Sequence, residues 1–167
     1  MPTVTPGRAA APAPPEGTVV FLIGMRINRA WDVRRWLPVI RAMPAMLREL
    51  LQDPDSGLLD ATTWLSGRTI LVKQYWRSFE ALDAYARDRD RRHRPAWHAF
   101  NVRARGNAAV GIFHETYVVG PGRAESIYVN MPQTGLARAL GSLGAGEVAD
   151  GAPQRLRTVL AATSSHP

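Results

Sequence analysis

The chain has no cysteine and almost no lysine. Without cysteine it can form no disulfide, no thiolate metal site and no cysteine nucleophile. Lys73 is the only lysine among 21 basic residues, and the formal net charge is +7. Arginine use of this kind, with many alanines and prolines, is typical of a GC-rich coding bias. We therefore interpret the charge as a solvated surface and do not expect nucleic acid as a partner.

Long apolar runs and familiar catalytic motifs are also missing. The longest apolar run, Val19–Met25, is far too short to cross a bilayer. The first residues lack the charged and apolar regions of a secretory signal. No glycine-rich nucleotide loop, GxSxG elbow or HExxH helix is present. We expect a soluble, cytoplasmic protein with no membrane partner.

Composition divides the chain into a central domain and two tails. Residues 1–17 hold five prolines and one valine, which predicts a flexible arm because such a segment buries little apolar surface. Residues 18–140 are long enough to form one domain with a hydrophobic core. Residues 141–167 are rich in Gly, Ala and Ser and predict a second flexible tail.

The pattern of the central region predicts an α+β fold. Two helices are expected, one within 31–51 with an apolar stripe and a kink at Pro44, and one capped by Ser78. Asn28 is a candidate cap for the first. A short strand at 124–130 and a helical turn or two within 131–140 follow. The main strands are expected at 18–26, 58–65, 69–76 and 107–119.

This order of elements is ferredoxin-like, β-α-β-β-α-β, with an antiparallel sheet and both helices on one face. The other face of the sheet would be bare. A bare face on apolar strands is most simply covered by a second copy of the same sheet. We therefore expect a homodimer in which the two sheets form a dimeric α/β barrel.

Two adjacent residues in the last main strand are candidates for catalysis. His114 and Glu115 must point to opposite faces of a strand, so only one of them can face a cavity. Either can serve as a base. The alternative is a buried hydrogen bond to a helix arginine, Arg34 or Arg41.

A second group of candidates surrounds the strand 69–76 and the segment that follows the second helix. His93 can ligate a haem iron and Trp97 can wall a pocket, or His93 can lie on a solvated turn while Trp97 is core. Tyr75 and Lys73 can orient a substrate oxygen, although strand aromatics are often core residues. The remaining candidates for contact with an apolar substrate are Trp76, Phe113 and Tyr117.

Several segments together resemble a known family. They are VVFLIGMRINRAWDVRRWLPVIRAMPAMLREL, TILVKQYWRSFEALDAYARD, HRPAWHAFN, VGIFHETYVV and ESIYVNMP. Over residues 18–136 they resemble a monooxygenase-like domain family of the dimeric α/β-barrel superfamily. That superfamily also holds antibiotic-biosynthesis monooxygenases, haem-degrading monooxygenases and haem aldoxime dehydratases. Fold transfers across such a resemblance better than function does.

The resemblance implies either no cofactor or haem b. In haem-degrading relatives a histidine late in the second helix ligates iron, and His93 corresponds best to it; Trp97 and Asn28 correspond only loosely to the Trp and Asn near that haem. Cofactor-free relatives deprotonate a phenol and let the resulting carbanion meet molecular oxygen. For that route His114 or Glu115 as base, with Tyr75 as hydrogen-bond donor, is sufficient.

Three functions follow as hypotheses. The first is an oxygenase-type enzyme that acts on an apolar or aromatic small molecule of secondary metabolism, bound between sheet and helices. The second is a haem-binding dehydratase or isomerase of the aldoxime-dehydratase kind. The third is a non-catalytic module that binds a small ligand or an acidic partner through the arginines of 87–105.

Overall fold

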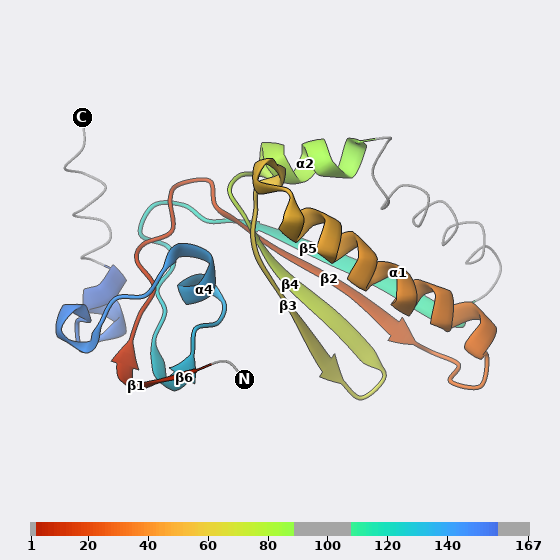
Figure 1. Cartoon of the computed structure of the whole chain (residues 1–167), viewed down its shortest axis with the longest axis horizontal. Helices are drawn as coiled ribbons and strands as arrows, with labels where there is room; N and C mark the ends of the chain where they lie inside the picture. Colours follow the sequence, from red (N-terminus) through yellow and green to blue (C-terminus); the bar gives the residue numbers. More distant parts are fainter. Residues whose placement is uncertain (1–2, 89–107, 157–167) are drawn as a thin grey trace.

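Four antiparallel strands in the order β3-β4-β2-β5 form the main sheet of the computed structural model, which describes residues 3–88 and 108–156 (Figure 1). This is the predicted ferredoxin-like arrangement, in which the first and third strands of the fold are neighbours at the centre of the sheet. The strands are β2 (Val19–Ile27), β3 (Leu58–Ser66), β4 (Thr69–Trp76) and β5 (Val110–Val118).

The β3-β4 hairpin forms where the sequence predicts it. Its register runs from Ser66 opposite Thr69 to Asp60 opposite Tyr75, with an irregularity between Leu58 and Asp60. Gly67 has a φ of 55°, a left-handed conformation that a tight turn requires and that glycine adopts without steric cost.

Helix α1 (Val33–Gln52) follows β2 and runs without interruption through Pro38 and Pro44. The helix begins at Val33, within the predicted range, and Asp32 rather than the predicted Asn28 is its N-cap residue. The Asn28 side chain is used elsewhere, since its Nδ2 donates to the carbonyl of Ala108 at 2.9 Å. Each proline removes one backbone hydrogen bond, but the apolar stripe continues on both sides of it.

Helix α2 (Phe79–Arg87) has the predicted start. The Ser78 hydroxyl accepts a hydrogen bond from the amide of Ala81 at 3.3 Å, and Glu80 lies in the first turn, where a negative charge is favourable. In the last turn Arg87 pairs with Asp83, one helical turn earlier.

Both helices pack on the same face of the sheet, as Figure 1 shows for α1 along the strands. The core cluster there consists of Val19 and Trp76 from the sheet, Leu50 from α1 and Leu82 from α2. Trp76 is fully buried, and its indole N–H donates to Gln74 Oε1 at 2.8 Å. Trp76 is thus a core residue between the sheet and the helices, and its role in substrate contact stays a prediction.

A second, two-stranded sheet lies beside one end of the first (Figure 1). It pairs β1 (Val4–Ala9) with β6 (Tyr128–Pro132), and α4 (Leu136–Leu140) follows β6. The prediction of a flexible arm is therefore wrong for residues 4–9. The proline-rich sequence is accommodated because the register shifts between Thr5 and Arg8, where the amide of Gly7 donates to the Asn130 side chain.

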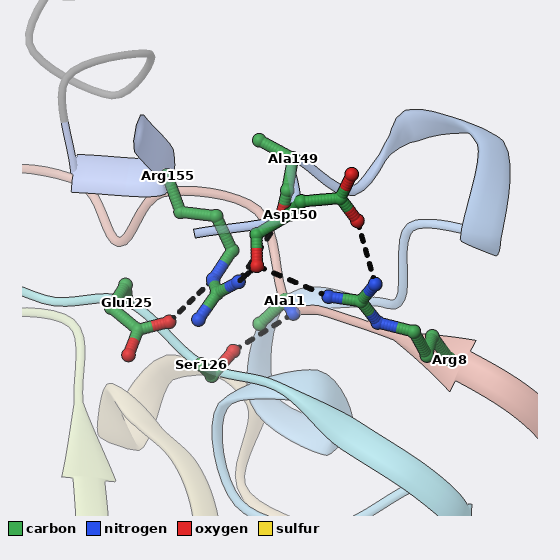
Figure 2. A network of polar contacts seen from close by, with 7 residues as sticks. All are labelled: Arg8, Ala11, Glu125, Ser126, Ala149, Asp150 and Arg155. Carbon is green, nitrogen blue, oxygen red and sulfur yellow. Dashed lines mark hydrogen bonds and ion pairs between the residues drawn. The ribbon is translucent and has the colours of Figure 1, made fainter. Parts of the chain in front are cut away.

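Part of the predicted second tail is also held in place. Leu143 exchanges backbone hydrogen bonds with Ala10 at 2.7 and 3.2 Å. The Arg155 guanidinium donates to the Glu125 carboxylate at 2.7 Å and to the carbonyl of Ala149 at 3.0 Å (Figure 2). Arg8 of β1 binds the carboxylate of Asp150 in the same network (Figure 2). These contacts join segments from both ends of the described chain.

Among residues 3–88 and 108–156, none of the helices is both long and apolar enough to cross a membrane.

Candidate functional site

The two faces of the main sheet differ sharply in their titratable residues. Since Val19 and Trp76 contact the helices, the residues that share their face are set by the strand registers. In the strands that the structure describes, His114 is the only titratable side chain on this helix face. The other helix-face residues are Phe21, Ile23, Met25, Ile27, Leu58, Ala61, Thr63, Leu65, Ile70, Val72, Gln74, Val110, Ile112, Thr116 and Val118.

The imidazole of His114 packs beside the aromatic ring of Phe21. Its ring centroid is 5.8 Å from that of Phe21, with an angle of 40° between the ring planes. His114 is exposed, because β5 is an edge strand of the sheet. Within the described residues it makes no hydrogen bond to Arg34 or Arg41, so the alternative of a buried bond to a helix arginine is not realised there. Within the part of the chain that the structure describes, the imidazole is therefore open to a ligand or a proton.

The opposite face, which we call the far face, carries six titratable residues in its central rows. They are Arg26, Asp60, Lys73, Tyr75, Glu115 and Tyr117. Glu115 and Tyr75 thus share a face, while His114 lies on the other side of the sheet from both. Tyr75 and Tyr117 are separated by Val20 of β2, which corresponds to two strand spacings, or roughly 10 Å.

Glu115 and Tyr117 form a local pair on the far face. The Tyr117 hydroxyl donates to Glu115 Oε2 at 2.6 Å, and this hydrogen bond raises the pKa of Tyr117. Phe113 precedes them on the same face and is 42% exposed. Its ring lies over Gly24, where any added side chain would collide with it.

Tyr75 lies at the centre of a second polar group on the far face. Burial, together with the charges of Tyr128 and Asp60, raises the pKa of Tyr75 to about 12. Its hydroxyl therefore stays protonated and can donate a hydrogen bond at any physiological pH. The ammonium of Lys73 lies 5.4 Å from the Tyr75 ring and 5.9 Å from the Trp64 ring, a cation–π arrangement.

Helix α4 covers this group from outside the sheet. Arg138 of α4 forms an ion pair with Asp60 and donates to the carbonyl of Ala61 at 2.8 Å and to the Thr62 hydroxyl at 2.9 Å. The Asp60 side chain is only 6% exposed, so this pair neutralises a carboxylate that would be costly to bury alone. Sequence reasoning missed Asp60, Tyr128 and Arg138, because only the folded chain brings β3, β6 and α4 together.

Two of the candidate residues lie outside the described residues. They are His93, the candidate haem ligand, and Trp97. Most of the arginine-rich segment 87–105 lies outside as well, and Arg87 within it is already paired with Asp83. In the part of the chain that is described, no three His, Cys, Asp or Glu side chains gather as they would around a metal ion.

Comparison with known proteins places the chain in a family. Residues 18–136 match the family described as Monooxygenase af470-like. The chain belongs to this family. It is 33% identical over 122 residues to monooxygenase af470 of Aspergillus fumigatus, a match that covers 67% of this chain and 42% of the relative. The chain thus spans less than half the length of that protein.

Two solved structures share the fold. An aldoxime dehydratase, OxdRE in complex with butyraldoxime, superposes with a TM-score of 0.63 at 15% identity, over 81% of this chain and 39% of the enzyme. A second aldoxime dehydratase superposes with a TM-score of 0.58 at 20% identity, over 83% of this chain and 44% of the enzyme. At these identities the likeness shows the fold alone. The predicted family and fold class are confirmed, and the dimeric barrel stays a prediction.

Proposed function

We propose that the chain is an oxygenase-type enzyme that binds an apolar or aromatic small molecule against the helix face of the sheet, with His114 as the group that accepts its proton. The observation that carries the proposal is the isolation of His114. Among the described residues of the sheet it is the only titratable side chain on the helix face, which is otherwise neutral, and an aromatic ring lies beside it. Membership of a monooxygenase-like family supports the reaction class.

The chemistry needs no metal from the protein. His114 takes a proton from an activated carbon or phenol of the substrate, and the carbanion that results combines with molecular oxygen to form a peroxide. Loss of a second proton and cleavage of the O–O bond convert a methylene to a carbonyl and release water. One oxygen atom enters the product and the other leaves as water. Histidine suits the first step because it ordinarily changes protonation near neutral pH.

His114 is better placed than Glu115 for this role. Glu115 shares the far face with Lys73, Asp60 and Arg26, and it already accepts a hydrogen bond from Tyr117. Tyr75 is also on the far face, so it cannot serve as hydrogen-bond donor to a substrate that contacts His114 in the same chain. Of the three predicted catalytic residues, only His114 would then contact the reacting atoms.

The second candidate function is a haem-dependent dehydratase or isomerase. The residues of the helix face fit a haem in kind: the imidazole of His114 would ligate the iron, and the apolar neighbours Phe21, Ile23 and Ile112 would contact the ring. When bound, haem would supply an iron centre for oxygen or aldoxime chemistry. His114 and the face around it would hold the ring and limit access of water.

We further propose that the active form is a homodimer in which a second copy covers the far face. One row of this face, next to the row that holds Arg26, is apolar: Leu71, Gly24 and Phe113 lie in it, and Trp64 is paired with Leu71. Trp64 is 53% exposed and Phe113 42%. Exposed aromatic residues on one face of a sheet are typical of protein–protein interfaces.

Oxygen uptake and visible absorption test the two functions together. The purified chain is titrated with haem and, separately, offered enolisable phenolic ketones in an oxygen electrode. Uptake that depends on His114, with a featureless spectrum, supports the cofactor-independent oxygenase. A Soret band that saturates at one haem per chain, and that is lost in His114→Ala but kept in Thr116→Ala, supports the haem enzyme instead. If the chain shows no oxygen uptake and binds no haem, both proposed functions are contradicted.

A further inference from the structure

A cavity of about 210 Å³ lies between the chain that follows β1, the segment before β6 and the segment after α4. Residues 10–14, with the sequence Ala-Ala-Pro-Ala-Pro, form one wall, and Leu136, Leu143 and Val148 contribute to the others. The small side chains of the first wall leave the space open. In an engineered protein a cavity of roughly 150 Å³ holds a benzene molecule. This cavity is therefore large enough for one ring with a polar group attached.

The walls of the cavity are fixed by hydrogen bonds. Ala10 and Leu143 exchange backbone bonds at 2.7 and 3.2 Å. The hydroxyl of Ser126 accepts from the amide of Ala11 at 2.9 Å, so the segment before β6 is joined to the first wall (Figure 2). The cavity is thus already formed without a ligand, and binding does not have to order its walls.

The polar end of the cavity is an ion pair between Arg155 and Glu125, which both line it. The side chains are 12% and 26% exposed, so the pair is largely shielded from bulk water. Arg155 donates from Nε to Glu125 Oε2, and from Nη1 to the carbonyls of Ala149 and Asp150 (Figure 2). Its third nitrogen, Nη2, donates to none of the described residues.

This pair leaves a donor and an acceptor for a ligand. Arg155 Nη2 is the donor, and Glu125 Oε1 is the acceptor, since it receives no hydrogen bond from the described residues. Ser126 also lines the cavity, and the proton of its hydroxyl is uncommitted there because the oxygen acts as acceptor. Shielded polar groups are normally paired, and water beside apolar walls finds few partners. A group that carries an acceptor next to an N–H donor satisfies both sides, as a primary amide does.

The charges of the lining favour an uncharged ligand. Glu125 and Arg155 neutralise each other, and Glu147 adds one further negative charge. Glu147 is exposed at the rim, where it accepts from the amide of Gly144 at 3.0 Å. An anionic ligand would bring another negative charge beside two carboxylates, and a cationic ligand would face the Arg155 guanidinium. Either charge would also lose its hydration on entry, which an uncharged group avoids.

We propose that this cavity binds a small uncharged amide with an apolar body of about one ring. The site is separate from the His114 site and does not depend on the function proposed there. The carbonyl oxygen of the ligand accepts from Arg155 Nη2 and from the Ser126 hydroxyl, and its N–H donates to Glu125 Oε1. The apolar body contacts residues 10–14 and Leu143.

Calorimetric titration of the full chain with benzamide tests the proposal, and we expect saturable binding at one molecule per chain. Two ligands of nearly the same shape are the controls. Acetophenone has a methyl group in place of the amide nitrogen and should bind about three- to tenfold more weakly, because it offers Glu125 no donor. Benzoate carries a negative charge and should bind at least about tenfold more weakly.

A change at Glu125 locates the site. Glu125→Gln keeps an oxygen for Arg155 but puts an amide nitrogen in place of the free acceptor. It should weaken benzamide binding by at least about tenfold and strengthen benzoate binding, since one negative charge is gone. A merely structural defect would weaken both ligands. Glu147→Gln is the matched control: it removes the same charge at the rim and should leave benzamide binding unchanged.

Circular dichroism establishes that each variant is folded. If Glu125→Gln does not fold, the order of the three ligands on the native chain decides. The proposal would be overturned by absence of saturable benzamide binding, by benzoate binding more tightly than benzamide to the native chain, or by benzamide binding that Glu125→Gln leaves unchanged. Equal weakening of benzamide and benzoate in that variant would overturn it as well.

Discussion

His114 and Glu115 are consecutive in the chain, but β5 directs their side chains to opposite faces of the main sheet. His114 lies on the apolar helix face against Phe21, and Glu115 lies on the charged far face, hydrogen-bonded to Tyr117. Two residues that look equivalent in the sequence as candidate bases thus lie in different environments. This separation makes them a matched pair of positions for testing which face performs the chemistry.

Replacing Trp76 should lower the stability of the fold. The side chain is fully buried among Val19, Leu50 and Leu82, and it satisfies the Gln74 amide oxygen. Trp76→Ala should lower the free energy of unfolding by about 3–5 kcal/mol, because it opens a cavity and leaves a buried acceptor unpaired. Urea unfolding followed by far-UV circular dichroism measures this. A loss below about 1 kcal/mol would show that Trp76 is not a core residue.

Gly24 and Phe113 should be coupled. A methyl group at Gly24 would overlap the outer atoms of the Phe113 ring, which is half-exposed and can turn away. Gly24→Ala should therefore cost about 1 kcal/mol in the native background and much less in a Phe113→Ala background. A double-mutant cycle by urea unfolding gives the coupling energy. Strictly additive effects would mean that the ring does not lie over Gly24.

Tyr75 should make stability sensitive to alkaline pH. Folding raises the pKa of Tyr75 from 10 to about 12, so the folded state holds this proton more tightly than the unfolded state does. The contribution to stability is complete below pH 10 and is lost as the pH rises through 12. The contribution of Tyr75 to the free energy of unfolding should be about 1 kcal/mol lower at pH 11 than at pH 8. Urea unfolding at pH 8 and pH 11 measures this loss, and the Tyr75→Phe variant should not show it. If the variant loses as much stability as the native chain between the two pH values, the raised pKa of Tyr75 is contradicted.

The far face should hold the protein together as a dimer. Phe113→Glu places a charge within the apolar row of this face and should convert a dimer to a monomer in analytical ultracentrifugation. Phe79→Glu is the matched control, since Phe79 is a similarly exposed aromatic residue at the start of α2. It should leave the dimer intact. A native chain that sediments as a monomer at micromolar concentration would rule out the dimer proposal.

The elements of the main sheet could be predicted from the sequence because their signals are local. Alternating β-branched residues gave β4, turn residues gave the β3-β4 hairpin, and Ser78 gave the start of α2. The segment 4–9 could not be predicted, because its pairing with β6 is a contact between residues more than a hundred positions apart. Composition alone describes such a segment as disordered.

The candidate site was predictable only in part, for the same reason. Alternation along β5 correctly separates His114 from Glu115. It does not tell which face the helices cover, and this choice decides which of the two contacts an apolar substrate. The group of Asp60, Tyr75, Tyr128 and Lys73 depends on β6 and α4 folding back onto β3, and no short-range pattern encodes that contact.

The most direct measurement of the central claim compares oxygen uptake by His114→Gln and Glu115→Gln with that of the native chain, on a phenolic ketone that the native chain oxidises. Glutamine keeps the size and polarity of both side chains but cannot act as a base near neutral pH. If His114 accepts the proton, His114→Gln should lower kcat/KM by about 10²–10⁴-fold, while Glu115→Gln stays within a few-fold of native. The reverse result would place the reaction on the far face and contradict the proposed function.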